Sequence, residues 1–235
     1  MKIEDAVVLV TGANRGIGRA FVEAALRKGA RKVYAAMRTP EESPDPRVQC
    51  VKLDVTDDLQ ARTLAQTCGD VTLLVNNAGI AHAGGFLAEH SAQLLQRHLD
   101  TNVFGFLQVT RAFAPILARN GGGAILNVLS ILSWFNGPML GAYGVSKSAA
   151  WAVTNGTREE LRAQNTQVVA LHMGFVDTDL ARDFDAPKLS PQEVADRALD
   201  GVAAGATEVL IDERTRQVRQ GLSAEPGFYL NPYNS

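Results

Sequence analysis

Residues 6–29 read AVVLVTGANRGIGRAFVEAALRKG, and this stretch decides the fold. The apolar run at 6–10 predicts a buried parallel strand, and residues 19–28 carry apolar side chains at helical spacing before Gly29 stops the helix. The glycines between them let the backbone approach a pyrophosphate, which then faces the positive end of the helix. This context predicts a dinucleotide site rather than a bare glycine-rich turn, with contacts from Gly12, Asn14, Arg15, Gly16, Ile17 and Gly18.

Strand and helix patterns alternate along the rest of the chain. Apolar runs predict further strands at 32–36, 48–53, 71–75, 124–128, 167–172 and 209–211, and helical spacing predicts helices at 59–68, 91–119, 143–162 and 190–203. This alternation is typical of a Rossmann-type α/β fold, a doubly wound parallel sheet with helices on both faces. We therefore expect a single domain over residues 1–235, with a sheet of about seven strands.

Composition and charge narrow the class of protein. Apolar residues make up 46% of the 235 residues, enough for one full-sized core, and a net charge of −2 argues against a nucleic-acid partner. Cys50 and Cys68 have no ligand spacing, which argues against disulfides and zinc and favours a reducing cytosol. Because no apolar run is long enough for a bilayer and the start is acidic, we expect a cytoplasmic protein without a signal peptide or membrane contact.

The four histidines share no metal-ligand spacing. We therefore expect no metal site. The residues expected on the surface or on a helix are His82, His90, His98 and His172.

The end of the second predicted strand indicates which dinucleotide is bound. Sites that prefer NAD usually place an acid there for the ribose hydroxyls. Here residues 35–38 read AAMR, with no acid before Glu41, so Arg38 offers a positive fork for a 2′-phosphate and Arg15 closes the same pocket from the glycine loop. This favours NADP(H); the alternative is that both arginines are solvated.

Polar residues follow two other predicted strands, at the edge where parallel sheets bind ligands. After the third strand, Asp54 and Val55 are candidate cofactor contacts, and Asp54 either meets the adenine edge or caps the next helix. The run NNAG at 76–79 ties neighbouring strands together and lines the cofactor cleft, unless it is a plain turn. Its expected cofactor contacts are Asn77, Ala78 and Gly79.

Tyr143 and Lys147 are four residues apart in the run GAYGVSKS at 141–148, a spacing that puts both on one helix face. A phenol has a pKa near ~10 and a neighbouring ammonium lowers it, so the pair supplies a proton donor near neutral pH unless it is an ordinary exposed pair. Ser130, after the fifth strand, can hydrogen-bond a substrate carbonyl, with Ser133 as its competitor. Asn102 interrupts a long helix and indicates a kink that holds a water.

The motifs TGxxxGIG (11–18), NNAG (76–79), Asn102, Ser130 and YxxxK (143–147) occur in an order that resembles the short-chain dehydrogenase/reductase family. The resemblance implies that Tyr143 passes a proton to or from the substrate oxygen, and that Lys147 lowers the Tyr143 pKa and holds the nicotinamide ribose. It implies that Ser130 orients the carbonyl and that Asn102 anchors a water that relays protons to Lys147. The segment implied to seat the nicotinamide contributes Gly174, Val176 and Thr178.

Three departures from the family pattern concern the nicotinamide and substrate ends. Met173 replaces the usual proline before Gly174, which changes the shape expected there. Leu129 stands where a second serine is frequent, which leaves Ser130 as the candidate hydroxyl. The segment after Thr178 is short, so residues 179–189 predict a small or open lid and loose substrate selection.

These residues predict an NADPH-dependent oxidoreductase that reduces a ketone or aldehyde, or oxidises a secondary alcohol in reverse. Two other classes stay open: a catalytically silent dinucleotide sensor of this fold, and another Rossmann enzyme such as a methyltransferase or flavoprotein, in which YxxxK has no role. Residues 103–118 are apolar on more than one face, which predicts the subunit interface of a homodimer or homotetramer. Apolar loop residues favour a hydrophobic substrate unless they pack in the core or at an interface, and these are Phe86, Leu132, Trp134, Phe135, Met139 and Leu140.

Overall fold

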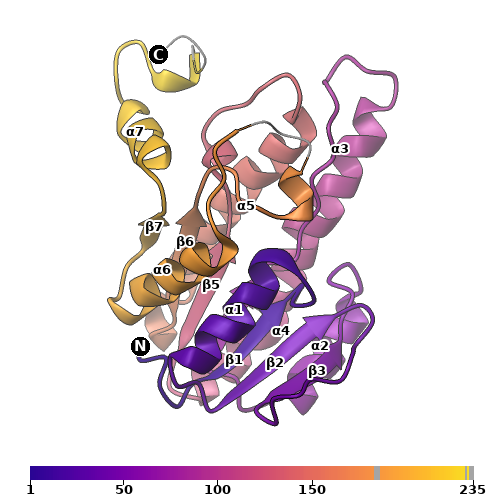
Figure 1. Cartoon of the computed structure of the whole chain (residues 1–235), viewed down its shortest axis with the longest axis vertical. Helices are drawn as coiled ribbons and strands as arrows, with labels where there is room; N and C mark the ends of the chain where they lie inside the picture. The colour runs from indigo at the N-terminus through magenta and orange to yellow at the C-terminus, as the bar shows by residue number, and fades with distance from the viewer. Residues whose placement is uncertain (183–185, 231, 233–235) are drawn as a thin grey trace.

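Seven parallel strands form one sheet in the part of the chain that the structure describes (Figure 1). The computed structural model describes residues 1–182, 186–230 and 232, and its strand order is β3-β2-β1-β4-β5-β6-β7. This arrangement confirms the predicted Rossmann-type fold class. The strands are β1 Val7–Thr11, β2 Lys32–Met37, β3 Val48–Lys52, β4 Leu73–Asn76, β5 Ala124–Val128, β6 Gln167–His172 and β7 Glu208–Leu210.

Helices cover both faces of this sheet (Figure 1). They are α1 Gly16–Arg27, α2 Asp58–Thr67, α3 Ser91–Leu99, α4 Phe106–Arg119, α5 Gly141–Glu160, α6 Pro191–Ala203 and α7 Glu213–Gly221. On one face, α1 and α6 share a core with Val8 of β1. On the other, α2 and α4 share a core with Leu9, because neighbouring residues of a strand point to opposite faces. Both faces are therefore buried, as the continuous apolar strands predicted.

The order in which strands are added to the sheet reverses between β1 and β4, which lie side by side and are parallel. From β1 the sheet continues through β2 and β3, and from β4 it continues through β5, β6 and β7, a reversal that opens a crevice at the carboxyl ends of the strands. Thr11 Oγ1 accepts hydrogen bonds from the backbone amides of Asn77 and Ala78, at 2.9 and 3.0 Å, and Asn77 Nδ2 donates to the Thr11 carbonyl at 2.9 Å. The NNAG run therefore ties the two strands together, as predicted.

The helical region at 91–119 is interrupted where the sequence placed a kink. A π-helical turn at Asp100–Gly105 separates α3 from α4 and contains Asn102. The sequence did not predict α7, because Val218 is the only strongly apolar residue among its nine. Instead Asp212 starts this helix, since its carboxylate accepts from the Thr215 amide at 2.8 Å and from Thr215 Oγ1 at 2.8 Å.

His172 contradicts the expectation of a surface or helix histidine. It is the last residue of β6 and has no exposed surface, because the Trp134 ring stacks on it with 4.1 Å between ring centres. His98 lies on α3 as predicted, but it too is fully buried. The sequence therefore located His98 correctly and placed His172 in the wrong environment.

Candidate active site

A cleft of about 1190 Å³ crosses the carboxyl edge of the sheet, where β1 and β4 diverge. The residues predicted to contact the cofactor all line it, whereas Asn102 stands behind its wall. These lining residues come from the glycine loop, from the ends of β2, β3 and β4, from α5 and from the segment after β6. They are Gly12, Asn14, Arg15, Gly16, Ile17, Gly18, Arg38, Asp54, Val55, Asn77, Ala78, Gly79, Tyr143, Lys147, Gly174, Val176 and Thr178.

The glycine loop has the shape of a cradle for phosphate. A Cβ on Gly18 would lie 2.1 Å from the Gly12 carbonyl oxygen, so only glycine lets α1 approach the end of β1 this closely. Arg15 precedes α1 without a capping side-chain hydrogen bond, and the first turn holds no acid. The amides at this helix start are therefore left to an anionic ligand such as a pyrophosphate.

The two arginines expected near a 2′-phosphate lie in different surroundings. Arg38 lines the cleft just beyond β2 and has no ion pair among the described residues. Arg15 also lines the cleft, but its Nη1 lies 2.6 Å from Asp179 Oδ2. A phosphate would therefore meet Arg38 directly and would have to compete with Asp179 for Arg15.

Asp54 lines the cleft beyond β3 and does not cap the next helix. Its Oδ1 accepts from the Thr56 amide at 3.0 Å and from Thr56 Oγ1 at 2.7 Å. The cap of α2 is Asp57, whose side chain accepts from the Gln60 amide. The capping alternative for Asp54 is therefore wrong, and Asp54 remains a candidate for contact with the cofactor because it lines the cleft.

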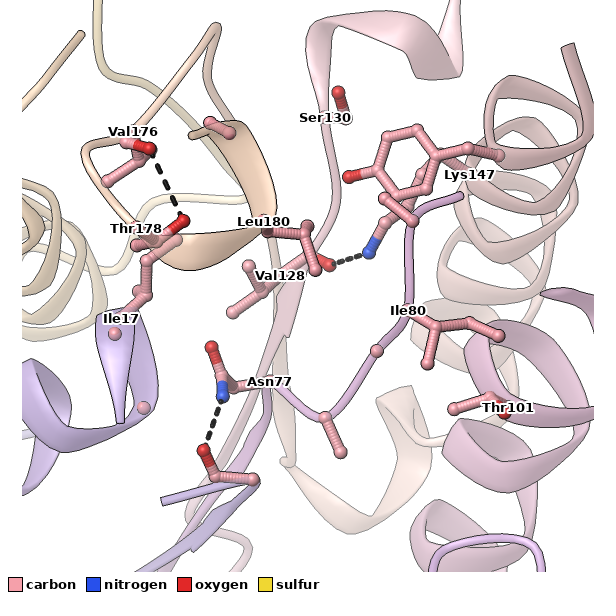
Figure 2. A pocket seen from close by; sticks show the side chains of 18 of the residues that line it. Ile17, Asn77, Ile80, Thr101, Val128, Ser130, Lys147, Val176, Thr178 and Leu180 are labelled. Carbon is pink, nitrogen blue, oxygen red and sulfur yellow. Dashed lines mark hydrogen bonds between the residues drawn. The ribbon is translucent and has the colours of Figure 1, made fainter. Parts of the chain in front are cut away.

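Ser130, Tyr143 and Lys147 meet in one wall of the cleft. Ser130 comes two residues after β5, and Tyr143 lies in the first turn of α5. Lys147 lies one turn further along α5, with its Nζ 5.6 Å from the centre of the Tyr143 ring. This ammonium donates to the Val128 carbonyl at 2.7 Å (Figure 2), which holds it between β5 and the phenol.

Burial changes the acidity of both partners in a way that the sequence did not predict. It raises the pKa of Tyr143 to about 12, partly opposed by a hydrogen bond with the Ser130 side chain, and it lowers the pKa of Lys147 to about 8. The expected lowering of the Tyr143 pKa by Lys147 is therefore wrong for the chain by itself. The reason is that low-dielectric surroundings disfavour the charged form of each group.

The Ser130 backbone is held by His172, which the sequence did not mark as part of the site. His172 Nδ1 lies 3.0 Å from the Ser130 carbonyl oxygen. Burial lowers the pKa of His172 to about 4, so the ring is neutral near pH 7 and its Nδ1–H donates to that oxygen. The pairing of β5 with β6, in which Val128 lies opposite Leu171, was the available signal that a residue at the end of β6 would reach Ser130.

Asn102 acts through hydrogen bonds to the protein. Its Nδ2 donates to the Ile80 carbonyl and to Ser146 Oγ, both at 2.9 Å, and its Oδ1 accepts from the Ile80 amide at 2.8 Å. Both Nδ2 hydrogens of Asn102 therefore already have acceptors. A water bound by Asn102 would have to donate its own hydrogen to Asn102 Oδ1 or to the Asn102 backbone carbonyl. Its place behind Ile80, which lines the cleft, makes it a support for that wall.

The substrate end of the cleft combines apolar side chains with one cation. Of the six apolar candidates, Leu132, Phe135, Met139 and Leu140 line the cleft, whereas Phe86 packs against Gly141 and Trp134 is buried on His172. The sequence missed Arg214, which lines the cleft from α7. Within the expected lid, Asp179–Ala181 forms a short helical turn at the cleft, and residues 183–185 lie outside the described residues.

Neither a metal centre nor a membrane span is found within residues 1–182, 186–230 and 232. No group of three or more His, Cys, Asp or Glu side chains there could hold a metal ion. No helix in these ranges combines the length and apolar character needed to cross a bilayer.

Comparisons with known proteins place this site in a family. Residues 6–188 match the family model described as short chain dehydrogenase. A short chain dehydrogenase from Burkholderia cenocepacia, solved in complex with NADP, is 39% identical with a TM-score of 0.91, over 96% of each chain. A short chain dehydrogenase/reductase from Burkholderia phymatum, solved with NAD, is 26% identical with a TM-score of 0.82, over 96% of each chain.

A curated relative points the same way. The 3alpha-hydroxysteroid dehydrogenase of Mediterraneibacter gnavus is 29% identical over 81% of this chain and 82% of its own length. The family model covers most of the chain and includes the glycine loop, Ser130, Tyr143 and Lys147. With the parallel sheet and the nucleotide-shaped cleft already described, the chain belongs to the short-chain dehydrogenase/reductase family of oxidoreductases.

Proposed function

We propose that this chain reduces a ketone or an aldehyde with NADPH, and oxidises a secondary alcohol in the reverse direction. The observation that carries the proposal is that Ser130, Tyr143 and Lys147 share one wall of a cleft that also contains the glycine loop. A hydroxyl, a phenol and an ammonium together can orient a carbonyl and protonate its oxygen. A protein that only bound a dinucleotide would need neither the Ser130 hydroxyl nor the Tyr143 phenol beside it.

The cleft fits NADP(H) in two respects. The uncapped start of α1 and the close approach at Gly18 suit the pyrophosphate. Arg38, which has no ion pair within the described ranges, suits a 2′-phosphate. Structures similar to this chain contain NADP in one case and NAD in another, so the preference for NADP rests on Arg38. When bound, the cofactor supplies the hydride, and we assign its nicotinamide end to Gly174, Val176 and Thr178.

The chain's own residues supply the proton and the orientation. Ser130 Oγ donates a hydrogen bond to the substrate carbonyl oxygen, which lowers the cost of the charge that develops there. Tyr143 then gives its phenolic proton to that oxygen, so the carbonyl becomes a hydroxyl and the phenol becomes a phenolate. Because the pKa of Tyr143 is about 12, the phenol holds its proton at neutral pH, which is the form that reduction requires.

The proposal is tested by NADPH consumption with a panel of ketones and aldehydes. We expect turnover by the wild-type protein and a loss of nearly all turnover in Tyr143→Phe, with NADPH binding retained. Wild-type rates in this variant would show that Tyr143 is not the proton donor. Silence of the wild-type protein across the panel, with NADPH still bound, would favour the catalytically silent sensor instead.

A thermal-shift comparison separates this proposal from other enzymes of the fold. A ligand that binds only the folded state raises its melting temperature. We expect NADPH to give the largest rise, NADH a smaller one, and FAD and S-adenosylmethionine none. A rise with FAD or S-adenosylmethionine alone would contradict the assignment.

We further propose that the protein works in the cytoplasm as a homodimer or homotetramer. Most apolar residues at 103–118 are already buried, among them Val109 and Phe113, so the sequence overstated the apolar surface available. Phe104 is the exception that supports an interface, because 48% of it is exposed on the π-helical turn before α4.

A further inference from the structure

Arg214 brings a positive charge to the cleft. It is the second residue of α7 and lines the cleft. Its Nη2 donates to the Pro232 carbonyl at 3.0 Å, and its guanidinium carbon lies 5.0 Å from the centre of the Phe228 ring. A carbonyl and an aromatic face orient the guanidinium without neutralising it, and no carboxylate pairs with Arg214 among the described residues.

The helix that carries Arg214, α7, contacts two segments of the site: the one that begins at Gly174 and the one that follows Ser130. Asp212, which starts α7, accepts a hydrogen bond from the Gly174 amide at 2.9 Å and so joins the helix to the proposed nicotinamide end. Val218 of α7 shares a buried cluster with Ile131, which follows Ser130 directly. Arg214 is thus held at a set position relative to Ser130 and Gly174, as a binding group must be.

A chain of rings connects Arg214 to the substrate wall. Phe135 lines the cleft, and its ring lies 5.6 Å from that of Phe228, over which the Arg214 guanidinium lies. Leu132 and Met139 line the cleft as well. The cation therefore stands beside an apolar wall, with the Arg214 side chain itself exposed to solvent.

The other cations that line the cleft are already accounted for. Arg15 is paired with Asp179, and Lys147 donates to the Val128 carbonyl beside the reacting phenol. Among the residues that the structure describes, Arg38 has no ion-pair partner, as is also true of Arg214, but it lies just beyond β2, on the far side of β1 from Ser130. Within the described part of the chain, the cleft thus has one guanidinium without a carboxylate partner for the cofactor phosphate. A second one, that of Arg214, has no carboxylate partner and no assigned ligand.

We infer that the substrates are oxo acids, in which an apolar or aromatic skeleton joins the reacting carbonyl to a carboxylate that pairs with Arg214. This rests on the proposed function, because Ser130 and Tyr143 define where the carbonyl lies. A guanidinium fork matches the two oxygens of a carboxylate, and a charge-assisted pair distinguishes an acid from its neutral ester. Arg214 would then select the substrate, while Tyr143 and Ser130 act on it.

The kinetic test compares each acid with its own methyl ester. Benzoylpropionate and benzoylbutyrate differ by one methylene in the span between carbonyl and carboxylate, and levulinate has the span of benzoylpropionate without its aromatic ring. Each ester keeps the skeleton while removing the charge. For the best-fitting acid we expect kcat/KM to exceed that of its ester by about 10- to 100-fold, the range for one hydrogen-bonded charge. Equal values within every pair would overturn the inference.

Variants assign the preference to Arg214. Arg214→Gln should bring the acid-to-ester ratio of kcat/KM close to one, and Arg214→Lys should restore part of it because the charge returns. Arg162→Gln is the matched control: this arginine is 73% exposed, pairs with Glu159 and does not line the cleft, so the ratio should stay at the wild-type value. An unchanged ratio in folded Arg214→Gln would refute the inference, since loss of a purely structural contact would affect acid and ester alike.

A binding measurement separates this inference from the proposed reaction. Calorimetry with NADPH-loaded Tyr143→Phe should show tighter binding of benzoylbutyrate than of its methyl ester, and Arg214→Gln added to this variant should remove the difference. If the difference appears but no carbonyl is reduced by the wild-type protein, the inference stands and the proposed reaction fails. If neutral ketones are reduced but the acid is never preferred, the reaction stands and the inference fails.

Discussion

His172→Phe tests whether a neutral buried histidine holds the catalytic segment. A phenyl ring keeps the stack on Trp134, but it cannot donate to the Ser130 carbonyl and cannot be protonated. The Ser130 carbonyl keeps a second donor, the Ser133 amide at 3.0 Å. The change also removes His172 Nε2, a buried nitrogen without a hydrogen-bond partner. At neutral pH we therefore expect the free energy of unfolding to fall by no more than about 1 kcal/mol.

The larger effect of His172 on the free energy of unfolding is expected at acid pH. Burial lowers the pKa of His172 from 6.5 to about 4, so between these values the unfolded chain takes up a proton that the folded chain refuses. The free energy of unfolding therefore falls as pH drops from 6.5 towards 4, and at about 1.4 kcal/mol per pKa unit the loss amounts to about 3 kcal/mol. Above pH 6.5 both states are neutral at this position, and His172 adds no slope.

The assay is urea unfolding at a series of pH values from about 7.5 to about 4.5. The free energy of unfolding of the wild-type protein should fall as the pH drops, and that of His172→Phe should fall by about 3 kcal/mol less over the same pH range. His90→Gln is the control, because this histidine is exposed and its removal should leave the acid limb unchanged. Parallel curves for wild type and His172→Phe would show that His172 is protonated equally in both states, and would refute the reasoning.

Three further changes test other parts of the molecule. Arg38→Asp should raise the Kd for NADPH about 10- to 100-fold more than the Kd for NADH, and equal losses would mean that Arg38 does not touch the 2′-phosphate. Gly18→Ala should abolish the NADPH-induced rise in melting temperature, because its Cβ would lie 2.1 Å from the Gly12 carbonyl oxygen, and a rise of wild-type size would contradict this. Phe104→Asp should dissociate the proposed oligomer in light scattering, and an unchanged mass would exclude this face as the interface.

The fold and much of the cleft could be predicted because their signals are local. The strand, glycine loop and helix at 6–29 are consecutive, and parallel strands place their ends at one edge of the sheet. Residues at those ends, such as Arg38 and Asn77, therefore came together in the cleft as predicted. The kink at Asn102 was also readable, since an asparagine disfavours the middle of a helix.

The other site features depend on contacts between distant segments. Arg15 pairs with Asp179, which lies 164 residues away in sequence, and nothing near either residue indicates this pair. Arg214 stands on a helix too polar to be recognised from apolar periodicity, and its contacts reach the C-terminal tail. The acidity of Tyr143 was misjudged for the same reason, because the spacing to Lys147 is visible in sequence and the burial of both groups is not.

That burial gives the Tyr143–Lys147 pair a direction in the proposed reaction. With a pKa of about 8 against about 12, the Lys147 ammonium is a stronger acid than the Tyr143 phenol. Once the phenol has given its proton to a carbonyl oxygen, proton transfer from Lys147 to the phenolate is favourable, and the donor is restored. Oxidation of an alcohol would need the reverse transfer, from the Tyr143 phenol to the neutral Lys147 amine, so that a phenolate is available to accept the alcohol proton. This transfer is unfavourable because the phenol is the weaker acid of the two. In the chain without bound cofactor, the apolar surroundings that disfavour both charges therefore favour a proton on the Tyr143 phenol over one on Lys147, the state from which reduction begins.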